Sequence, residues 1–135
     1  MEKSTQDKRA GRKSKLPQVY QFVSLVCVEC SIPDSVEEIE EYALRIIEGL
    51  KLTVIRKSAY TYQPTGITLV YILSQSHLVI HTWPEYRCLH IDLVSCIPLN
   101  NIKVKRVLRM SFQPLGICRF LFLSQGIGEK VYQHD

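Results

Sequence analysis

Apolar side chains recur along this chain at two different periods, and the change of period separates its predicted elements. Residues 19–28 are rich in β-branched and aromatic side chains, which predicts a first strand. Apolar positions then recur at helical spacing, which predicts a helix carrying Val36, Ile39, Ala43, Ile46, Ile47 and Leu50 on its inner face. Ser35 and Glu38 have the spacing of a capping box at the start of this helix, and Gly49 suits its end.

Extended segments follow the helix. They cover about residues 51–62, 67–75, 77–83 and 88–96. Proline and glycine in the run 63–66 predict a turn between the first two segments, and the run 84–87 separates the last two.

The last part of the chain is less uniform in its pattern. In residues 100–112, Asn101 could cap a helix that buries Val104, Val107, Leu108 and Ser111, yet the run 102–105 alternates as a strand does. Residues 116–123 are predicted to form a closing strand. The resulting order β-α-β-β-β-β-(α)-β predicts an α+β two-layer sandwich, with a mostly antiparallel sheet and helices on one face.

Length and composition limit the protein class. A chain of 135 residues that is 46% apolar and 22% charged has room for a single domain with a real core. No apolar run approaches the roughly 18 residues of a membrane span, and the N-terminus lacks the apolar region of a signal peptide. Five cysteines without such a signal indicate reduced thiols and a cytoplasmic location.

Positive charge is concentrated at the N-terminus. Residues 1–16 carry six basic and two acidic side chains, whereas residues 17–135 carry eleven of each. We therefore expect a disordered basic tail at 1–16 followed by one domain at 17–135. The neutral domain gives no electrostatic reason to bind nucleic acid, and nothing in it suggests a membrane partner.

Candidate chemistry gathers between residues 74 and 96, where Ser76, His81, Glu85 and Cys96 interrupt an apolar, β-rich region. A serine can cut its own backbone only at a strained or well-placed amide with a proton-transfer partner nearby. Side chains alternate between the faces of a strand, so Ser76 and His81, five residues apart, should point to opposite faces unless a bulge intervenes. Ser76 and Cys96, an even number apart, can lie on one face.

Other interpretations of these side chains are weaker. His77, His81, Cys88, His90 and Asp92 could in principle bind zinc, but we expect them to be split between the two faces and predict no metal site. The pair Cys27 and Cys30 is interpreted as packing at a strand end. Trp83 and Phe120 are interpreted as core residues.

The strings Tyr62-x-Pro64-x-Gly66 and His81-Thr82-Trp83-Pro84-Glu85, followed by Cys96, closely resemble the prokaryotic-type S-adenosylmethionine decarboxylase proenzyme family. The resemblance covers about residues 17–96. It implies a pyruvoyl-dependent enzyme that cleaves itself into 1–75 and 76–135 and makes its cofactor from Ser76. That cofactor forms a Schiff base with the substrate amine, and the decarboxylated product serves spermidine and other polyamine synthesis.

The resemblance also implies a role for each matching residue. Gln75 and Ser76 form the cleavage site, His81 and Thr68 assist processing, and Cys96 is the proton donor. Tyr62 would stack on the adenine, Glu85 would hold the ribose hydroxyls, and Gln75 would lie against the substrate. The family's active unit is a homodimer, with Ser76 and Cys96 from one protomer and Tyr62, Thr68, His81 and Glu85 from the other.

Some positions depart from the family pattern and leave alternatives open. Gln75 replaces a glutamate, Arg87 and Ile97 replace glycines, and Thr68 replaces a serine. The lost negative charge at Gln75 allows a pyruvoyl-dependent decarboxylase of another amino acid, such as ornithine or arginine. A non-catalytic homologue that acts as a binding partner is the third hypothesis, and joint retention of Ser76, His81 and Cys96 argues against it.

Overall fold

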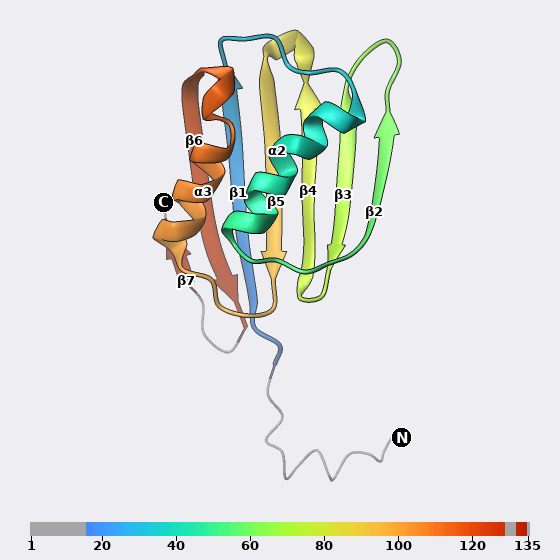
Figure 1. Cartoon of the computed structure of the whole chain (residues 1–135). Coiled ribbons are helices and arrows are strands. Elements are labelled where there is room, and N and C mark those ends of the chain that lie inside the picture. Colours follow the sequence, from blue (N-terminus) through green and yellow to red (C-terminus); the bar gives the residue numbers. More distant parts are fainter. Residues whose placement is uncertain (1–15, 129–131, 135) are drawn as a thin grey trace, which may run out of the picture.

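A single seven-stranded sheet forms the centre of the computed structural model, which describes residues 16–128 and 132–134 (Figure 1). Its strand order is β2-β3-β4-β5-β1-β6-β7, and every neighbouring pair is antiparallel. The strands are β1 (Val19–Val28), β2 (Val54–Thr61), β3 (Ile67–Leu73), β4 (Ser76–Trp83), β5 (Cys88–Ser95), β6 (Ile117–Ile127) and β7 (Tyr132–His134). The predicted basic tail lies, except for Leu16, outside the described residues.

Both described helices, α2 (Val36–Gly49) and α3 (Asn101–Ser111), cover the same face of the sheet (Figure 1). Two short 3₁₀ turns complete the fold, η1 (Pro84–Tyr86) and η2 (Gln113–Leu115). The predicted two-layer α+β sandwich is therefore confirmed. The opposite face of the sheet, called the open face below, carries no helix in the described part of the chain.

Helix α2 begins as its sequence predicts, because the Ser35 hydroxyl accepts a hydrogen bond from the backbone N–H of Glu38 at 3.2 Å. The helix ends at Gly49, as predicted. The residue with left-handed backbone is Lys51, with φ 56°, and Gly49 has a packing role. A Cβ at position 49 would lie 2.8 Å from Val107 Cγ1, so the glycine allows α2 to approach α3 closely.

The ambiguous segment 100–112 is the helix α3. Its N-cap is Asn100, whose side chain accepts from the backbone N–H of Lys103 at 2.8 Å, so the expected cap at Asn101 is wrong by one residue. Val104 and Leu108 are fully buried at helical spacing. Burial of this apolar stripe against the sheet stabilises the helix, although the short alternating pattern at 102–105 favours a strand.

Alternation along the central strands decides which side chains meet the helices. In β4, Leu78 and Ile80 are fully buried beneath the helices, so His77 before them and His81 after them turn to the open face. The buried core combines such positions with the inner faces of both helices; its largest fully buried members are Phe112, Ile39, Ile46, Ile67, Leu69, Leu78, Ile80, Leu89, Ile91, Leu93, Leu108 and Val26.

Candidate active site

Thr68 and His81 are cross-strand neighbours on β3 and β4. Thr68 Oγ1 lies 2.9 Å from His81 Nδ1 and 3.1 Å from the hydroxyl of Tyr62, so three side chains form one hydrogen-bonded row. The pairing register places them together because directly opposed residues in an antiparallel ladder have side chains on the same face.

Tyr62 is positioned by the predicted turn between β2 and β3. The Gln63–Pro64 peptide is cis, and the Tyr62 backbone N–H donates to the Gly66 carbonyl at 2.8 Å. Gly66 has φ 109°, a backbone conformation that a side chain would strain. The turn is thereby closed tightly enough to hold the Tyr62 ring beside Thr68.

A cavity of about 360 Å³ opens next to this row. Four of the predicted site residues line it, namely Tyr62, Thr68, His81 and Glu85, together with Thr65, Gly66, Thr82 and Trp83. The expectation that Trp83 is a core residue is wrong, because its side chain is 46% exposed and belongs to the cavity wall. Phe120, in contrast, packs against the core.

The η1 turn supplies Glu85 to the cavity. Pro84 starts the turn, and Arg87 closes it with left-handed backbone, φ 52°, and an N–H bond to the Pro84 carbonyl at 3.1 Å. A glycine suits that conformation better. The Arg87 guanidinium donates to the Glu29 carbonyl at 2.8 Å, which anchors the turn to the chain that follows β1.

Burial lowers the pKa of His81 below its ordinary value of 6.5, and the neighbouring His90 ring lowers it further, whereas Asp92 raises it. The two rings lie 5.6 Å apart between centroids. His81 is therefore neutral at neutral pH, with a ring nitrogen able to accept a proton. The β4–β5 register pairs His81 with His90 and Val79 with Asp92, and this proximity to His81 could not be predicted from the sequence.

Ser76 lies outside the cavity, at the opposite end of β4. Five residues of extended chain separate Ser76 from His81, a span of about 16 Å along the strand. No hydrogen bond can cross that distance within one protomer. The structure thus divides the predicted site into a cavity group (Tyr62, Thr68, His81 and Glu85) and a junction group (Gln75, Ser76 and Cys96).

The junction group surrounds the peptide bond between Gln75 and Ser76. Ser76 has φ 148°, a strained value for a residue with a side chain. The Gln75 carbonyl accepts a hydrogen bond from the backbone N–H of Cys96 at 3.0 Å. That donor polarises the same carbonyl that a serine hydroxyl would attack, and no sequence pattern indicated it.

The even spacing of Ser76 and Cys96 does not by itself decide whether they share a face. Ser76 pairs with Ser95 across β4 and β5, and Ser95 is buried on the helix side. Cys96 is exposed and follows directly on Ser95, the last residue of β5, so strand alternation does not assign it to either face. Residue counts between two different strands do not fix a common face; the register does.

The residues considered for zinc are also arranged differently from expectation. His77 and His81 alternate with buried β4 residues, and Cys88, His90 and Asp92 alternate with buried β5 residues, so all five share the open face and are not split. Even so, no group of three or more histidine, cysteine or carboxylate side chains suited to a metal ion occurs in the described residues.

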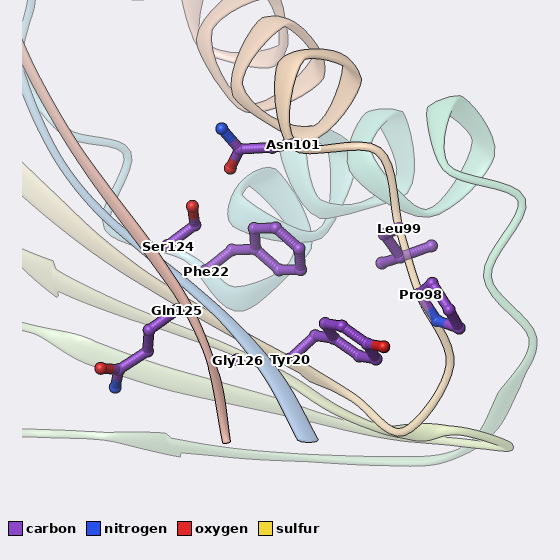
Figure 2. A pocket seen from close by; sticks show the side chains of 8 residues that line it. All are labelled: Tyr20, Phe22, Pro98, Leu99, Asn101, Ser124, Gln125 and Gly126. Carbon is purple, nitrogen blue, oxygen red and sulfur yellow. The ribbon is translucent and has the colours of Figure 1, made fainter. Parts of the chain in front are cut away.

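A second cavity, of about 330 Å³, lies on the helix side of the sheet (Figure 2). It is lined by Tyr20, Phe22, Pro98, Leu99, Asn101, Ser124, Gln125 and Gly126, none of which is a predicted site residue. The buried Oδ1 of Asn101 has no hydrogen-bond partner. Within the described ranges, no helix is long and apolar enough to cross a membrane.

Comparison with known proteins identifies relatives. The family model described as S-adenosylmethionine decarboxylase matches residues 22–118. The S-adenosylmethionine decarboxylase proenzyme of Pseudomonas paraeruginosa is 34% identical over 103 residues, which covers 76% of this chain and 62% of the relative. That of Aquifex aeolicus is 40% identical over 75 residues, or 56% of each chain. The chain thus spans about three fifths of the length of the Pseudomonas relatives.

A solved structure is similar as well. The crystal structure of the adenosylmethionine decarboxylase from Aquifex aeolicus superposes with a TM-score of 0.64 at 29% sequence identity. The match covers 82% of this chain and 90% of that one. The similarity extends over both the sheet and its covering helices.

Proposed function

This chain belongs to the S-adenosylmethionine decarboxylase family, and from that premise we propose that it is a self-cleaving, pyruvoyl-dependent decarboxylase of S-adenosylmethionine. The cut falls between Gln75 and Ser76. Its product, decarboxylated S-adenosylmethionine, supplies spermidine and polyamine synthesis. The five free cysteines support a reducing, cytoplasmic location for this activity.

The strained junction is the observation that carries the proposal. Ser76 Oγ attacks the Gln75 carbonyl carbon, and the acyl group moves from nitrogen to oxygen to give an ester. The Cys96 N–H, 3.0 Å from the carbonyl oxygen, stabilises the negative charge that develops there. Relief of the φ 148° backbone at Ser76 favours the forward direction.

Cleavage is completed by elimination. Loss of the α-proton of residue 76 breaks the ester C–O bond and releases Gln75 as a free carboxylate. The remaining dehydroalanine tautomerises and reacts with water, which releases ammonia and leaves a pyruvoyl group at position 76. His81, neutral because its pKa is lowered by burial and His90, is the proton acceptor, and Thr68 holds its ring.

The residues around the junction fit such a group. When present, the pyruvoyl carbonyl supplies an electron sink for the bond that releases CO₂. The backbone N–H of Cys96 donates to the Gln75 carbonyl at 3.0 Å, so Cys96 lies next to the junction. We assign Cys96 as the acid that returns a proton to the substrate carbon.

The division of the site supports a homodimer. His81 and Ser76 lie about 16 Å apart along one strand, and we therefore assign the base and the nucleophile to different protomers. The open face can supply the contact, because Ile72, Leu121 and Leu123 on it are 43–48% exposed. A two-fold axis would place each cavity group against the partner's junction group and create two equal sites.

The cavity supports a nucleoside-containing substrate. Tyr62 and Trp83 provide aromatic faces for an adenine, and the Glu85 carboxylate can accept hydrogen bonds from both ribose hydroxyls. Ornithine and arginine have no ring to stack and no vicinal hydroxyls. The aromatic wall therefore favours S-adenosylmethionine in spite of the neutral Gln75.

Mass spectrometry under denaturing conditions tests the proposal first. We expect two chains, one ending at Gln75 and a 60-residue chain that begins with pyruvoyl, and an uncut chain for Ser76→Ala. Release of CO₂ from S-adenosylmethionine, ornithine and arginine, measured side by side, then identifies the substrate. A wild-type chain that stays intact after long incubation would instead indicate the non-catalytic binding homologue.

A further inference from the structure

Two thiols that the proposed reaction does not use face each other across the sheet. Cys27 in β1 and Cys88 in β5 are register partners, and their sulfur atoms lie 2.8 Å apart. Both side chains are half-buried, and neither is in a disulfide. They lie at the η1 end of the sheet, beside the cavity wall.

The position of Cys27 and Cys88 in the hydrogen-bonding pattern of β1 and β5 brings their Cα atoms close together. The Val28 N–H donates to the Arg87 carbonyl at 2.9 Å, which marks the adjoining pair as a hydrogen-bonded one. Hydrogen-bonded and non-hydrogen-bonded pairs alternate in antiparallel sheets, so Cys27 and Cys88 occupy a non-hydrogen-bonded position. The Cα atoms of such pairs are about 4.5 Å apart, within the roughly 4.4–6.8 Å that a disulfide requires.

We propose that Cys27 and Cys88 are a redox-sensitive dithiol, which small-molecule disulfides such as oxidised glutathione convert reversibly into a cross-strand disulfide. The disulfide weakens substrate binding at the neighbouring cavity. The second statement rests on the proposed function; the first stands on the thiol geometry alone.

Thiol–disulfide exchange with oxidised glutathione proceeds in two steps. The Cys27 thiolate attacks oxidised glutathione, which forms a mixed disulfide and expels one glutathione thiolate. The Cys88 thiolate then attacks the Cys27 sulfur and expels the second glutathione. The two protons lost by the cysteines reside on the two molecules of reduced glutathione.

The environment assigns the order of attack. Burial raises the pKa of the Cys88 thiol to about 11, and the hydrogen bond with Cys27 adds to the effect. Cys88 therefore has a low thiolate fraction at neutral pH, and we assign the first attack to Cys27. Proximity compensates for the low thiolate fraction of Cys88 in the second, intramolecular step.

A structural link connects the pair to the cavity. The Cys88 thiol donates to the Tyr86 carbonyl at 3.2 Å, and Cys88 is also the β5 partner of Trp83. Oxidation removes that S–H donor from the η1 turn, which carries Glu85. We therefore expect a higher KM in the oxidised protein, with self-cleavage at the distant Ser76 unaffected.

Peptide mapping tests the disulfide without reference to activity. The full chain is equilibrated with oxidised and reduced glutathione, and its free thiols are then alkylated in acid. The protein is digested, and the masses of its peptides are measured by mass spectrometry. We expect one cross-link that joins Cys27 to Cys88, with the mass of two hydrogen atoms lost. A cross-link through Cys30 or Cys118 instead, or five free thiols in a strongly oxidising mixture, overturns the proposal.

Matched serine variants sharpen the assignment. Cys30→Ser and Cys118→Ser remove the two neighbouring exposed thiols and should retain the cross-link. Cys27→Ser should abolish it. Mapping of the wild-type protein alone decides the pairing if a variant fails to fold.

The effect of the disulfide on substrate binding is tested separately, by measuring KM. In wild type, oxidation should raise KM severalfold and dithiothreitol should restore it, whereas Cys27→Ser should respond to neither. A mapped disulfide with an unchanged KM overturns the link to the cavity. A protein that carries the disulfide but never decarboxylates any substrate refutes the proposed function and leaves the dithiol established.

Discussion

The backbone N–H of Cys96 donates to the carbonyl oxygen of Gln75 at 3.0 Å, so the residue proposed as proton donor also holds the bond proposed to be cut. The two contributions come from different atoms. The N–H belongs to the main chain and persists in any side-chain variant except proline. The thiol is free for a separate step.

Cys96→Ala should therefore separate cleavage from turnover. We expect processing to continue, because the N–H remains, and decarboxylation to fall roughly 10²–10⁴-fold, the usual loss for a missing general acid. Misplaced protonation should also inactivate the enzyme during turnover. Denaturing mass spectrometry and CO₂ release measure the two effects. Equal activity and durability in wild type and variant would remove Cys96 from the mechanism.

Mixed dimers should show which protomer supplies the base. Ser76→Ala and His81→Ala should each remain uncut alone. Co-expressed, they form heterodimers in which one site combines the intact Ser76 of one chain with the intact His81 of the other. Only the His81→Ala chain should then be cleaved, which its mass identifies. Heterodimers that form without cleavage contradict the shared site.

The acid limit of processing, meaning the lowest pH at which the chain still cleaves itself, should depend on the side chains next to His81. A lowered pKa keeps His81 neutral to a lower pH than an ordinary histidine. His90→Gln removes one cause of the lowering, so the acid limit should move to higher pH. Asp92→Asn removes the opposing charge, so the limit should move to lower pH. Cleavage rates of freshly refolded protein across pH measure both, and shifts of the same sign would contradict the assignment.

Adjacent asparagines offer a stability test of the α3 cap. Asn100→Ala removes the acceptor for the Lys103 N–H and should cost about 1 kcal/mol of unfolding free energy. Asn101→Ala removes a buried oxygen that has no partner, so its effect should be much smaller. Urea denaturation compares them. A larger loss at Asn101 would mean that the cap is assigned to the wrong residue.

Local patterns predicted most of the fold. Helix α2 was evident because its cap and its apolar stripe agree, and the strands were evident from composition and turn residues. Segment 100–112 was not decidable locally, because alternating lysines imitate a strand and only the burial of Val104 and Leu108 against the sheet favours a helix.

The site was harder to predict, because its geometry depends on register. The sequence motifs select candidate residues, but the pairing of Ser76 with Ser95 and of His81 with His90 is a long-range property that no residue count reveals. The same holds for Trp83, whose apolar ring suggested the core although it lines a cavity. The φ 148° at Ser76 leaves no trace in composition at all.

The strand order gives the sheet an interleaved construction with respect to the proposed cut. β1 belongs to the segment before Gln75, yet it is hydrogen-bonded between β5 and β6, which belong to the segment after it. β3 and β4 are likewise paired across the cut. Cleavage would thus break the covalent chain but leave strands of both fragments hydrogen-bonded in one sheet. The two fragments would separate only when the whole domain unfolds.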